Sequence, residues 1–202
     1  CIECMAGCAR LTSCLELEGM AAFGVDHKAN RHRPEGRVVI IDLSTPQGQK
    51  QILEPITLDS DVVFVWFGIP CGTMSRARGI PLPGGAPGPQ PLRSETLPLG
   101  LPGLGVKDSA RVTTANALID FSLECIRRCV LANIHWAIEN PERSSGGSRA
   151  LIIDLLQIGF DACYDACMLG GARPKHQRVR TSMLQLQAIA RPPYGRCDES
   201  HV

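Results

Sequence analysis

Cys71 has the position and the neighbours of a nucleophilic cysteine. It follows the run Val62–Trp66, whose β-branched and aromatic residues predict a buried strand that closes near Gly68 and Pro70. An open α/β sheet places its reactive groups just past the carboxyl ends of such strands. Because a thiolate is a strong nucleophile, we interpret Cys71 as a candidate for covalent catalysis. The alternative interpretation is a buried structural thiol at a strand end.

Residues with chemical potential also follow other predicted strands. Apolar runs predict strands over residues 1–5, 21–25, 38–41 and 135–138. The residues that follow these runs are Gly7, Asp26, Asp42 and Glu139. A doubly wound parallel sheet brings the carboxyl ends of its strands to one edge, so we expect these residues and Cys71 to line one site. Each is common at a turn when met singly, and their shared register is the stronger indication.

The remaining elements complete an α/β pattern. Helical spacing predicts a helix over 11–17, and Thr45 or Ser44 followed by Pro46 predicts the start of another. Asp108 and Ser109 predict the cap of a long helix over 110–131. A short helix at 149–158 and strands at 160–168 and 180–184 are expected further on. The fold class predicted is therefore α/β, Rossmann-like, with a doubly wound and mostly parallel sheet and helices on both faces.

Proline and glycine dominate residues 79–108 and interrupt this pattern. A long segment without secondary structure inside a compact domain is typically functional or mobile. We therefore expect a loop insertion in a single domain that spans residues 1–202. The chain begins at Cys1 without an initiator methionine, so we expect it to be a fragment of a longer protein.

Composition limits the classes of partner. The net charge is +1 and charged residues make up 20% of the chain, so nucleic acid would have to bind a local patch rather than a global field. No apolar stretch reaches the roughly 18 residues that span a bilayer, so we expect no membrane segment. Ten cysteines in ordinary apolar patterns favour a reducing, intracellular compartment, with nucleus or cytoplasm left open.

Cysteine spacing also raises the possibility of a metal site. Cys1, Cys4 and Cys8 form one cluster, and Cys163 with Cys167 forms another. The second pair falls on one predicted strand, where the two thiols would lie too far apart to bind one ion. We therefore predict that the chain holds no metal.

The motifs around Cys71 and Glu139 resemble those of the DNA cytosine carbon-5 methyltransferases. The family's Gly-x-Pro-Cys-x-x-Phe-Ser motif is matched by residues 68–75, and its Glu-Asn-Val by Glu139-Asn140-Pro141. Weaker likenesses lie at residues 3–7, which resemble the cofactor loop, and at 177–180, which resemble Gln-x-Arg-x-Arg. The similarity covers roughly residues 2–183. A group of short methyltransferase-like reading frames with a terminal Cys-Asp-x-Ser-His element is similar as well.

The resemblance implies a fold, a cofactor, a substrate and roles for particular residues. It implies the S-adenosylmethionine-dependent methyltransferase fold and methyl transfer to cytosine carbon 5, with DNA a better candidate than RNA. The base must be flipped out or single-stranded to be reached. The residues implied for catalysis are Cys71, Glu139, Arg178 and Arg180. Those implied for S-adenosylmethionine are Met5, Ala6, Gly7, Asp26, His27, Asp42, Leu43 and Pro70. Those implied for the substrate are Ser75, Arg76, Arg78 and Asn140.

Departures from the family leave other functions open. Ala9 and Arg10 stand where the cofactor loop usually has glycines, and only 22 residues follow Arg180, too few for a target-recognition domain. A guiding partner or a missing recognition domain is therefore expected. One alternative is a catalytically degenerate methyltransferase-like module, such as a mobile element leaves behind. Another is an amino-group methyltransferase, although Pro192-Pro193-Tyr194 lacks the required preceding residue and is read as a turn.

Overall fold

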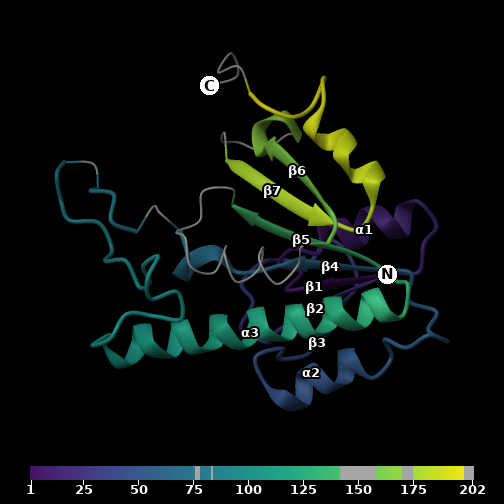
Figure 1. Ribbon diagram of the computed structural model, residues 1–202, viewed down its shortest axis with the longest axis horizontal. Coiled ribbons are helices and arrows are strands. Elements are labelled where there is room, and N and C mark those ends of the chain that lie inside the picture. The colour runs from purple at the N-terminus through teal and green to yellow at the C-terminus, as the bar shows by residue number, and fades with distance from the viewer. Residues whose placement is uncertain (76–77, 83, 142–157, 170–174, 198–202) are drawn as a thin grey trace.

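One seven-stranded sheet forms the centre of the molecule (Figure 1). The computed structural model describes residues 1–75, 78–82, 84–141, 158–169 and 175–197. The strands run in the order β3-β2-β1-β4-β5-β7-β6, and β7 is antiparallel to both of its neighbours while the other pairs are parallel. Their bounds are β1 Ile2–Cys4, β2 Phe23–Asp26, β3 Val38–Ile40, β4 Phe64–Gly68, β5 His135–Pro141, β6 Phe160–Asp165 and β7 His176–Thr181.

The strand order creates a crevice between β1 and β4. The chain moves outward from β1 to β2 and β3, then crosses back to form β4 on the other side of β1. At such a reversal the connections after the two neighbouring strands leave in opposite directions, which opens a space beyond their carboxyl ends. This confirms the predicted α/β class with a mostly parallel sheet, and it gives the site a defined place.

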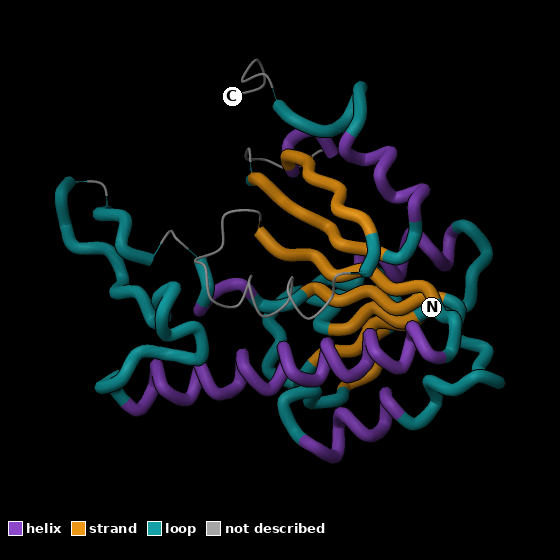
Figure 2. The backbone as a smooth tube through the Cα atoms, in the orientation of Figure 1, coloured by secondary structure: helices purple, strands orange, loops and turns teal. Residues whose placement is uncertain are grey.

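Helices cover both faces of the sheet (Figures 1 and 2). Helices α2 (Pro46–Leu53) and α3 (Val106–Leu131) pack on one face, and α1 (Arg10–Leu17) with the 3₁₀ helix η3 (Leu184–Ala190) lies on the other. Alternation along β4 supplies both cores, because Phe67 packs with α3 while Trp66 packs toward η3. Among the described helices, none is both long enough and apolar enough to cross a bilayer.

The N-cap predicted for α2 is confirmed, whereas the one predicted for α3 is not. Thr45 caps α2 as expected, and its Oγ1 accepts a hydrogen bond from the Gly48 amide at 3.1 Å. Helix α3 begins at Val106 with Gly105 as its N-cap, so the predicted cap at Asp108 was wrong by about one turn. Asp108 lies in the first turn instead, where its carboxylate faces the positive end of the helix and accepts from Arg111 at 3.1 Å.

Three predicted strand boundaries are corrected by pairing in the sheet. Strand β5 continues through Glu139 to Pro141 because β7 pairs with those residues, and β6 ends at Asp165. The seventh strand is His176–Thr181, not 180–184. Its buried and less buried residues alternate with the period of a strand. The charged residues of this segment had instead suggested a solvated loop. The helix expected at 149–158 falls almost wholly outside the described residues.

The proline- and glycine-rich segment between η1 (Cys71–Thr73) and α3 is docked on the body of the protein. Leu92 and Arg93 are only 1% and 3% exposed. The Arg93 guanidinium donates to Asn116 Oδ1 on α3 at 2.7 Å, to the Pro98 carbonyl at 2.5 Å and to Thr73 Oγ1 at 3.3 Å. Figure 2 shows the segment as loops beside the N-terminal end of α3. One buried arginine thus ties the loop to the helix and to the turn that carries Cys71.

Replacing Arg93 with methionine tests this anchor. Arg93→Met leaves the acceptors on Asn116 and Pro98 without a donor, so we expect the free energy of unfolding to fall by about 2 kcal/mol. Urea denaturation measures the change. The control is Arg127→Met at an exposed position of α3, for which we expect a loss of less than about 0.5 kcal/mol. Equal stabilities of the two variants would show that the buried guanidinium does not anchor the loop.

Candidate functional site

Cys71 lies at the carboxyl end of β4, where the strand turns into η1. Pro70 precedes it with extended ψ, and Cys71 is the first residue of the 3₁₀ turn that its carbonyl closes by accepting from Met74 N at 2.9 Å. Met74 is fully buried and anchors the turn from below, while Cys71 stays half-buried. Glycine is favoured at position 68, because a Cβ there would lie 3.2 Å from the carbonyl oxygen of Met5, the residue that follows β1.

Glu139 reaches the same place from the neighbouring strand. Glu139 pairs in register with Gly68, and both Cys71 and Glu139 line one cavity of about 350 Å³, here called the second cavity. Trp66 contributes an aromatic side chain to the wall of this cavity, and Lys175 contributes a basic one. The structure therefore brings together the two residues from which the family resemblance starts, although 67 positions separate them in the sequence.

Burial controls the charge of Glu139. Its withdrawal from water raises the pKa of its carboxyl group above the usual value, an effect that Lys175 opposes and Glu3 reinforces. Glu139 Oε1 accepts a hydrogen bond from Gln177 Nε2 at 2.5 Å. The carboxyl group is thus held in place by a neutral amide and biased toward its protonated form.

Glu3 is a buried acid beside Glu139 that sequence reasoning missed. It is 8% exposed, lines the second cavity, and its Oε2 accepts from both Thr12 N and Thr12 Oγ1 at 2.7 Å. Thr12 is the third residue of α1, whose amide has no partner within the helix, so Glu3 caps α1 from the sheet. Burial raises the pKa of Glu3. An acid in the middle of an apolar strand was the available sequence signal.

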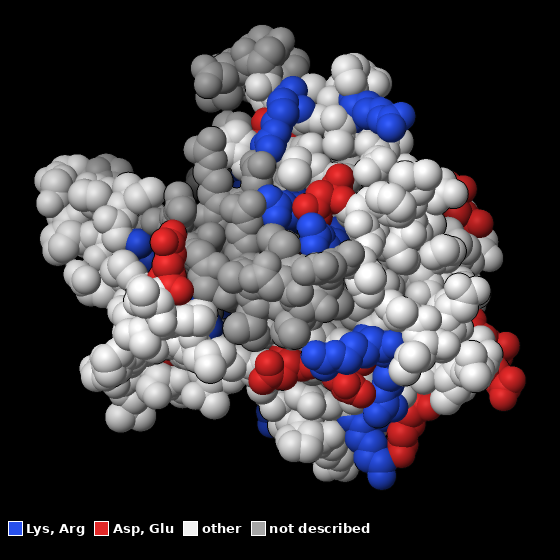
Figure 3. Space-filling view, viewed as in Figure 1, with Lys and Arg blue, Asp and Glu red and all other residues white. Residues whose placement is uncertain are grey.

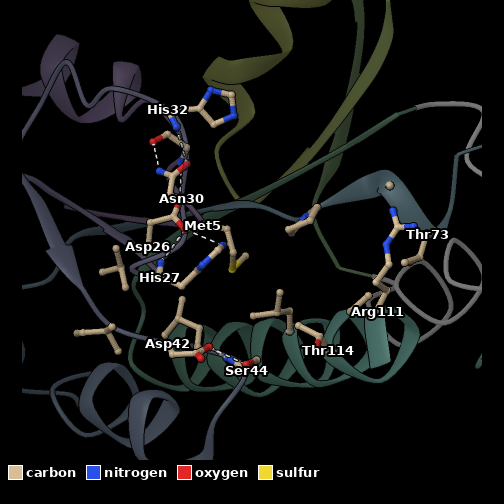
Figure 4. Close-up of a pocket in the computed structure, with 18 of the residues that line it drawn as sticks. Met5, Asp26, His27, Asn30, His32, Asp42, Ser44, Thr73, Arg111 and Thr114 are labelled. Atoms are coloured by element: carbon tan, nitrogen blue, oxygen red, sulfur yellow. Dashed lines mark hydrogen bonds and ion pairs between the residues drawn. The ribbon is translucent and has the colours of Figure 1, made fainter. Parts of the chain in front are cut away.

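A larger cavity of about 700 Å³, here called the first cavity, lies beyond the ends of β1, β2 and β3 (Figure 4). Asp26 is 8% exposed at the end of β2, where its two carboxylate oxygens accept from the amides of Gly7 and His27, both at 2.7 Å. Gly7 has φ +58°, a left-handed conformation that suits glycine. The acid and the glycine turn therefore form one unit.

The opposite wall of the first cavity comes from the β3–α2 turn and from α3. Asp42 Oδ1 accepts from the Ser44 hydroxyl at 2.6 Å and from its amide at 3.0 Å, and these bonds lower the pKa of Asp42. Thr114 and Arg111 on α3 face the same space in Figure 4. Sequence reasoning also missed Asn30, whose Nδ2 donates to the Gly7 carbonyl at 2.6 Å. Loop residues of this kind carry no periodic signal.

The two cavities share a wall. Met5 and Pro70 line both of them. Seven of the residues expected at the cofactor line the first cavity, and the eighth, Ala6, lines the second. The seven are Met5, Gly7, Asp26, His27, Asp42, Leu43 and Pro70. The arrangement is thus a larger crevice that carries two acids, Asp26 and Asp42, and a smaller thiol- and acid-bearing pocket that meet at one boundary.

Arg178 and Arg180 do not reach this site. Strand residues alternate between faces, and the pairs Asn140–Arg178 and Ile138–Arg180 place both arginines on the sheet face opposite Glu139 and Gln177. Arg180 binds Asp161 through Nε and Nη2 at 2.8 Å each. The family motif spaces its glutamine and arginines two apart, on one face, whereas Gln177 and Arg178 are adjacent. Because Gln177 and Arg178 are adjacent, their side chains lie on opposite faces of the sheet.

The residues expected to bind substrate are only partly at the site. Asn140 contributes to the second cavity. Arg78 is directed elsewhere, since its Nε donates to the Gln90 carbonyl at 2.9 Å and its Nη2 lies 3.9 Å from Asp108. Ser75 lines neither cavity. Arg76 lies outside the described residues.

Two further expectations concern metals and the chain's C-terminal turn. Within the described ranges, no group of three or more His, Cys, Asp or Glu side chains is placed to hold a metal ion. Pro192-Pro193-Tyr194 forms a turn after η3, as expected, and lines neither cavity.

Comparisons with known proteins assign no family. No protein-family model matches the chain, and no curated protein matches it. Function is therefore inferred from the residues and their geometry.

Glu139→Gln tests whether the pKa of this carboxyl group is raised in the folded protein. The folded state keeps a proton on Glu139 that the unfolded chain releases, so this contribution to stability is complete below the unfolded pKa of about 4.3 and is lost as pH rises through the higher folded pKa. We expect wild type to lose stability relative to Glu139→Gln over that interval, measured by urea unfolding at several pH values. The exposed control Glu95→Gln should follow wild type. Parallel curves for all three proteins would contradict a raised pKa of Glu139 in the folded state.

Proposed function

We propose that the protein transfers a methyl group from S-adenosylmethionine to carbon 5 of cytosine in nucleic acid, through a covalent bond to Cys71. The observation that carries this proposal is the shared wall: a thiol and a half-buried acid line one cavity, and an acid-bearing crevice adjoins it at Met5 and Pro70. Methyl transfer needs a donor site and an acceptor site in direct contact. The arrangement supports that requirement.

The strand order gives independent support for the fold assignment. The order 3-2-1-4-5 is shared with dinucleotide-binding Rossmann folds. The antiparallel β7 lies between β5 and β6, as the corresponding strand does in the S-adenosylmethionine-dependent methyltransferase fold, which supports the proposal. The fold therefore agrees with the resemblance in the motifs, although fold alone does not establish an activity.

The first cavity fits the chemistry of S-adenosylmethionine. Its volume of about 700 Å³ falls within the range of roughly 300–1,000 Å³ typical of small-molecule sites. Each Asp26 oxygen accepts one backbone amide and keeps a further lone pair, which would accept from the ribose hydroxyls. Asp42 Oδ2 would accept from the adenine amino group. The cofactor supplies an electrophilic methyl group on a sulfonium.

The second cavity fits a cytosine ring better than a uracil ring. The Cys71 thiolate would add to carbon 6 while Glu139 donates its proton to ring nitrogen 3, which makes carbon 5 nucleophilic enough to take the methyl group. Loss of the carbon 5 proton to a base then expels the thiolate, and nitrogen 3 returns its proton to Glu139. A protonated Glu139 matches the lone pair on nitrogen 3 of cytosine, whereas uracil carries a hydrogen there.

Trapping of the covalent intermediate tests the reaction. An oligonucleotide containing 5-fluorocytosine has no carbon 5 proton to lose, so with S-adenosylmethionine it should form a stable adduct with Cys71, detected as a mass increase of the whole protein. Cys71→Ser should form none, while Cys14→Ser, an exposed cysteine on α1, should react like wild type. An amino-group methyltransferase would instead keep its activity in Cys71→Ser.

Cofactor binding can be measured separately from the chemistry. Asp26→Ala removes the acceptor for the ribose and for the Gly7 amide, so we expect S-adenosylhomocysteine to bind about 10- to 100-fold more weakly in isothermal titration calorimetry. The control Asp59→Ala, outside both cavities, should leave the Kd unchanged. Equal affinities of Asp26→Ala and wild type would exclude the first cavity as the cofactor site.

A non-catalytic methyltransferase-like module is the second candidate. The position of Arg178 and Arg180 on the far face of the sheet favours it, because the arginines implied to steady the base are directed away from Glu139. On the face seen in Figure 3, the Lys and Arg side chains of the described residues are interspersed with Asp and Glu and form no broad basic surface among themselves. A folded protein that binds no S-adenosylhomocysteine at millimolar concentration would favour this candidate.

A further inference from the structure

Gln177 is a buried polar residue whose contact the proposed reaction does not yet use. Its side chain lies on β7, on the same sheet face as Glu139, and the residue is 5% exposed. Nε2 donates to Glu139 Oε1 at 2.5 Å, and Oε1 of Gln177 is buried without a hydrogen-bond partner in the described part of the chain. Leaving a buried amide oxygen unpaired costs free energy. The Gln177 side chain bears this cost while it makes its hydrogen bond to Glu139.

The donor decides where Glu139 can carry its proton. An amide N–H cannot be given up, so the carboxyl oxygen that accepts from it is not the oxygen that bears the acid proton. With Gln177 on Oε1, the proton of neutral Glu139 is confined to Oε2. Glu139 lines the second cavity, where a ring nitrogen would need that proton.

The identity of the donor matters as much as its place. A guanidinium in this position would hold Glu139 ionised, since a full positive charge favours the charged carboxylate. The arginines of β7 lie on the other face, and Arg180 is bound to Asp161. A neutral amide fixes the geometry without supplying a charge, which leaves burial to favour the protonated form.

We propose that Gln177 is a positioning residue: by donating to Oε1 it leaves Oε2 to carry the proton of the neutral Glu139 carboxyl group, directed at the substrate ring. This inference rests on the proposed function for the use of that proton, but the contact itself is independent of any activity. A glutamine at this position therefore orients the Glu139 carboxyl group, whereas an arginine there would hold it ionised.

Titration of Glu139 in Gln177→Met tests the proposal. Methionine keeps the length of the side chain and removes the donor, so the ionised form of Glu139 loses a hydrogen bond and its titration midpoint should rise by roughly one pH unit. The midpoint is followed by NMR of protein with carbon-13 in its glutamate carboxyl groups, with Glu139→Gln assigning the signal. Gln185→Leu, at an exposed position of η3, should leave the midpoint unchanged.

The outcomes separate this inference from the proposed function. The titration needs neither cofactor nor nucleic acid, so an unchanged midpoint in folded Gln177→Met overturns the role of Gln177 whatever the protein catalyses. If that variant does not fold, Gln177→Leu is measured in the same way. In active protein, the alkaline limb of the kcat profile should move with the midpoint while kcat falls. A lower kcat with an unmoved limb would mean that Gln177 is only structural.

Discussion

The close approach of β1 and β4 at their carboxyl ends is the constraint on which the site depends. The absence of a side chain at Gly68 lets the Met5 carbonyl lie against β4, and Met5 and Pro70 then become the common wall of the two cavities. The turn through Pro70 places Cys71 on one side of that wall, and Gly7 with Asp26 lies on the other. A side chain at Gly68 would bring a Cβ within 3.2 Å of the Met5 carbonyl oxygen and would push this shared wall out of its present position.

Burial of carboxyl groups gives the second cavity its chemical character. Glu3 and Glu139 are both withdrawn from water, and burial raises the pKa of each. Their hydrogen-bond donors differ in position but are both neutral: Thr12 at the start of α1 and Gln177 on β7. Neutral donors fix an acid in place without forcing it to ionise. The cavity is therefore suited to giving a proton rather than to binding a cation.

Sequence reasoning predicted the parts of this site that depend on strand ends. Cys71, Asp26 and Asp42 follow apolar runs, and parallel pairing brings such positions together. It did not predict the pairing of Glu139 with β7, because antiparallel partners depend on contacts distant in sequence. It also did not predict on which sheet face Arg178 and Arg180 lie, because the register of the strand decides that face. Glu3 was passed over since its cap on α1 exists only after folding.

The most direct test of the account observes the shared wall itself. NMR of protein with carbon-13 methyl-labelled methionine would follow the Met5 methyl while S-adenosylhomocysteine and then a cytosine-containing oligonucleotide are added. The account predicts that each ligand shifts the Met5 signal, that the second binds while the first remains, and that exposed Met20 does not move. Displacement of one ligand by the other, or an unmoved Met5 signal with both bound, would contradict it.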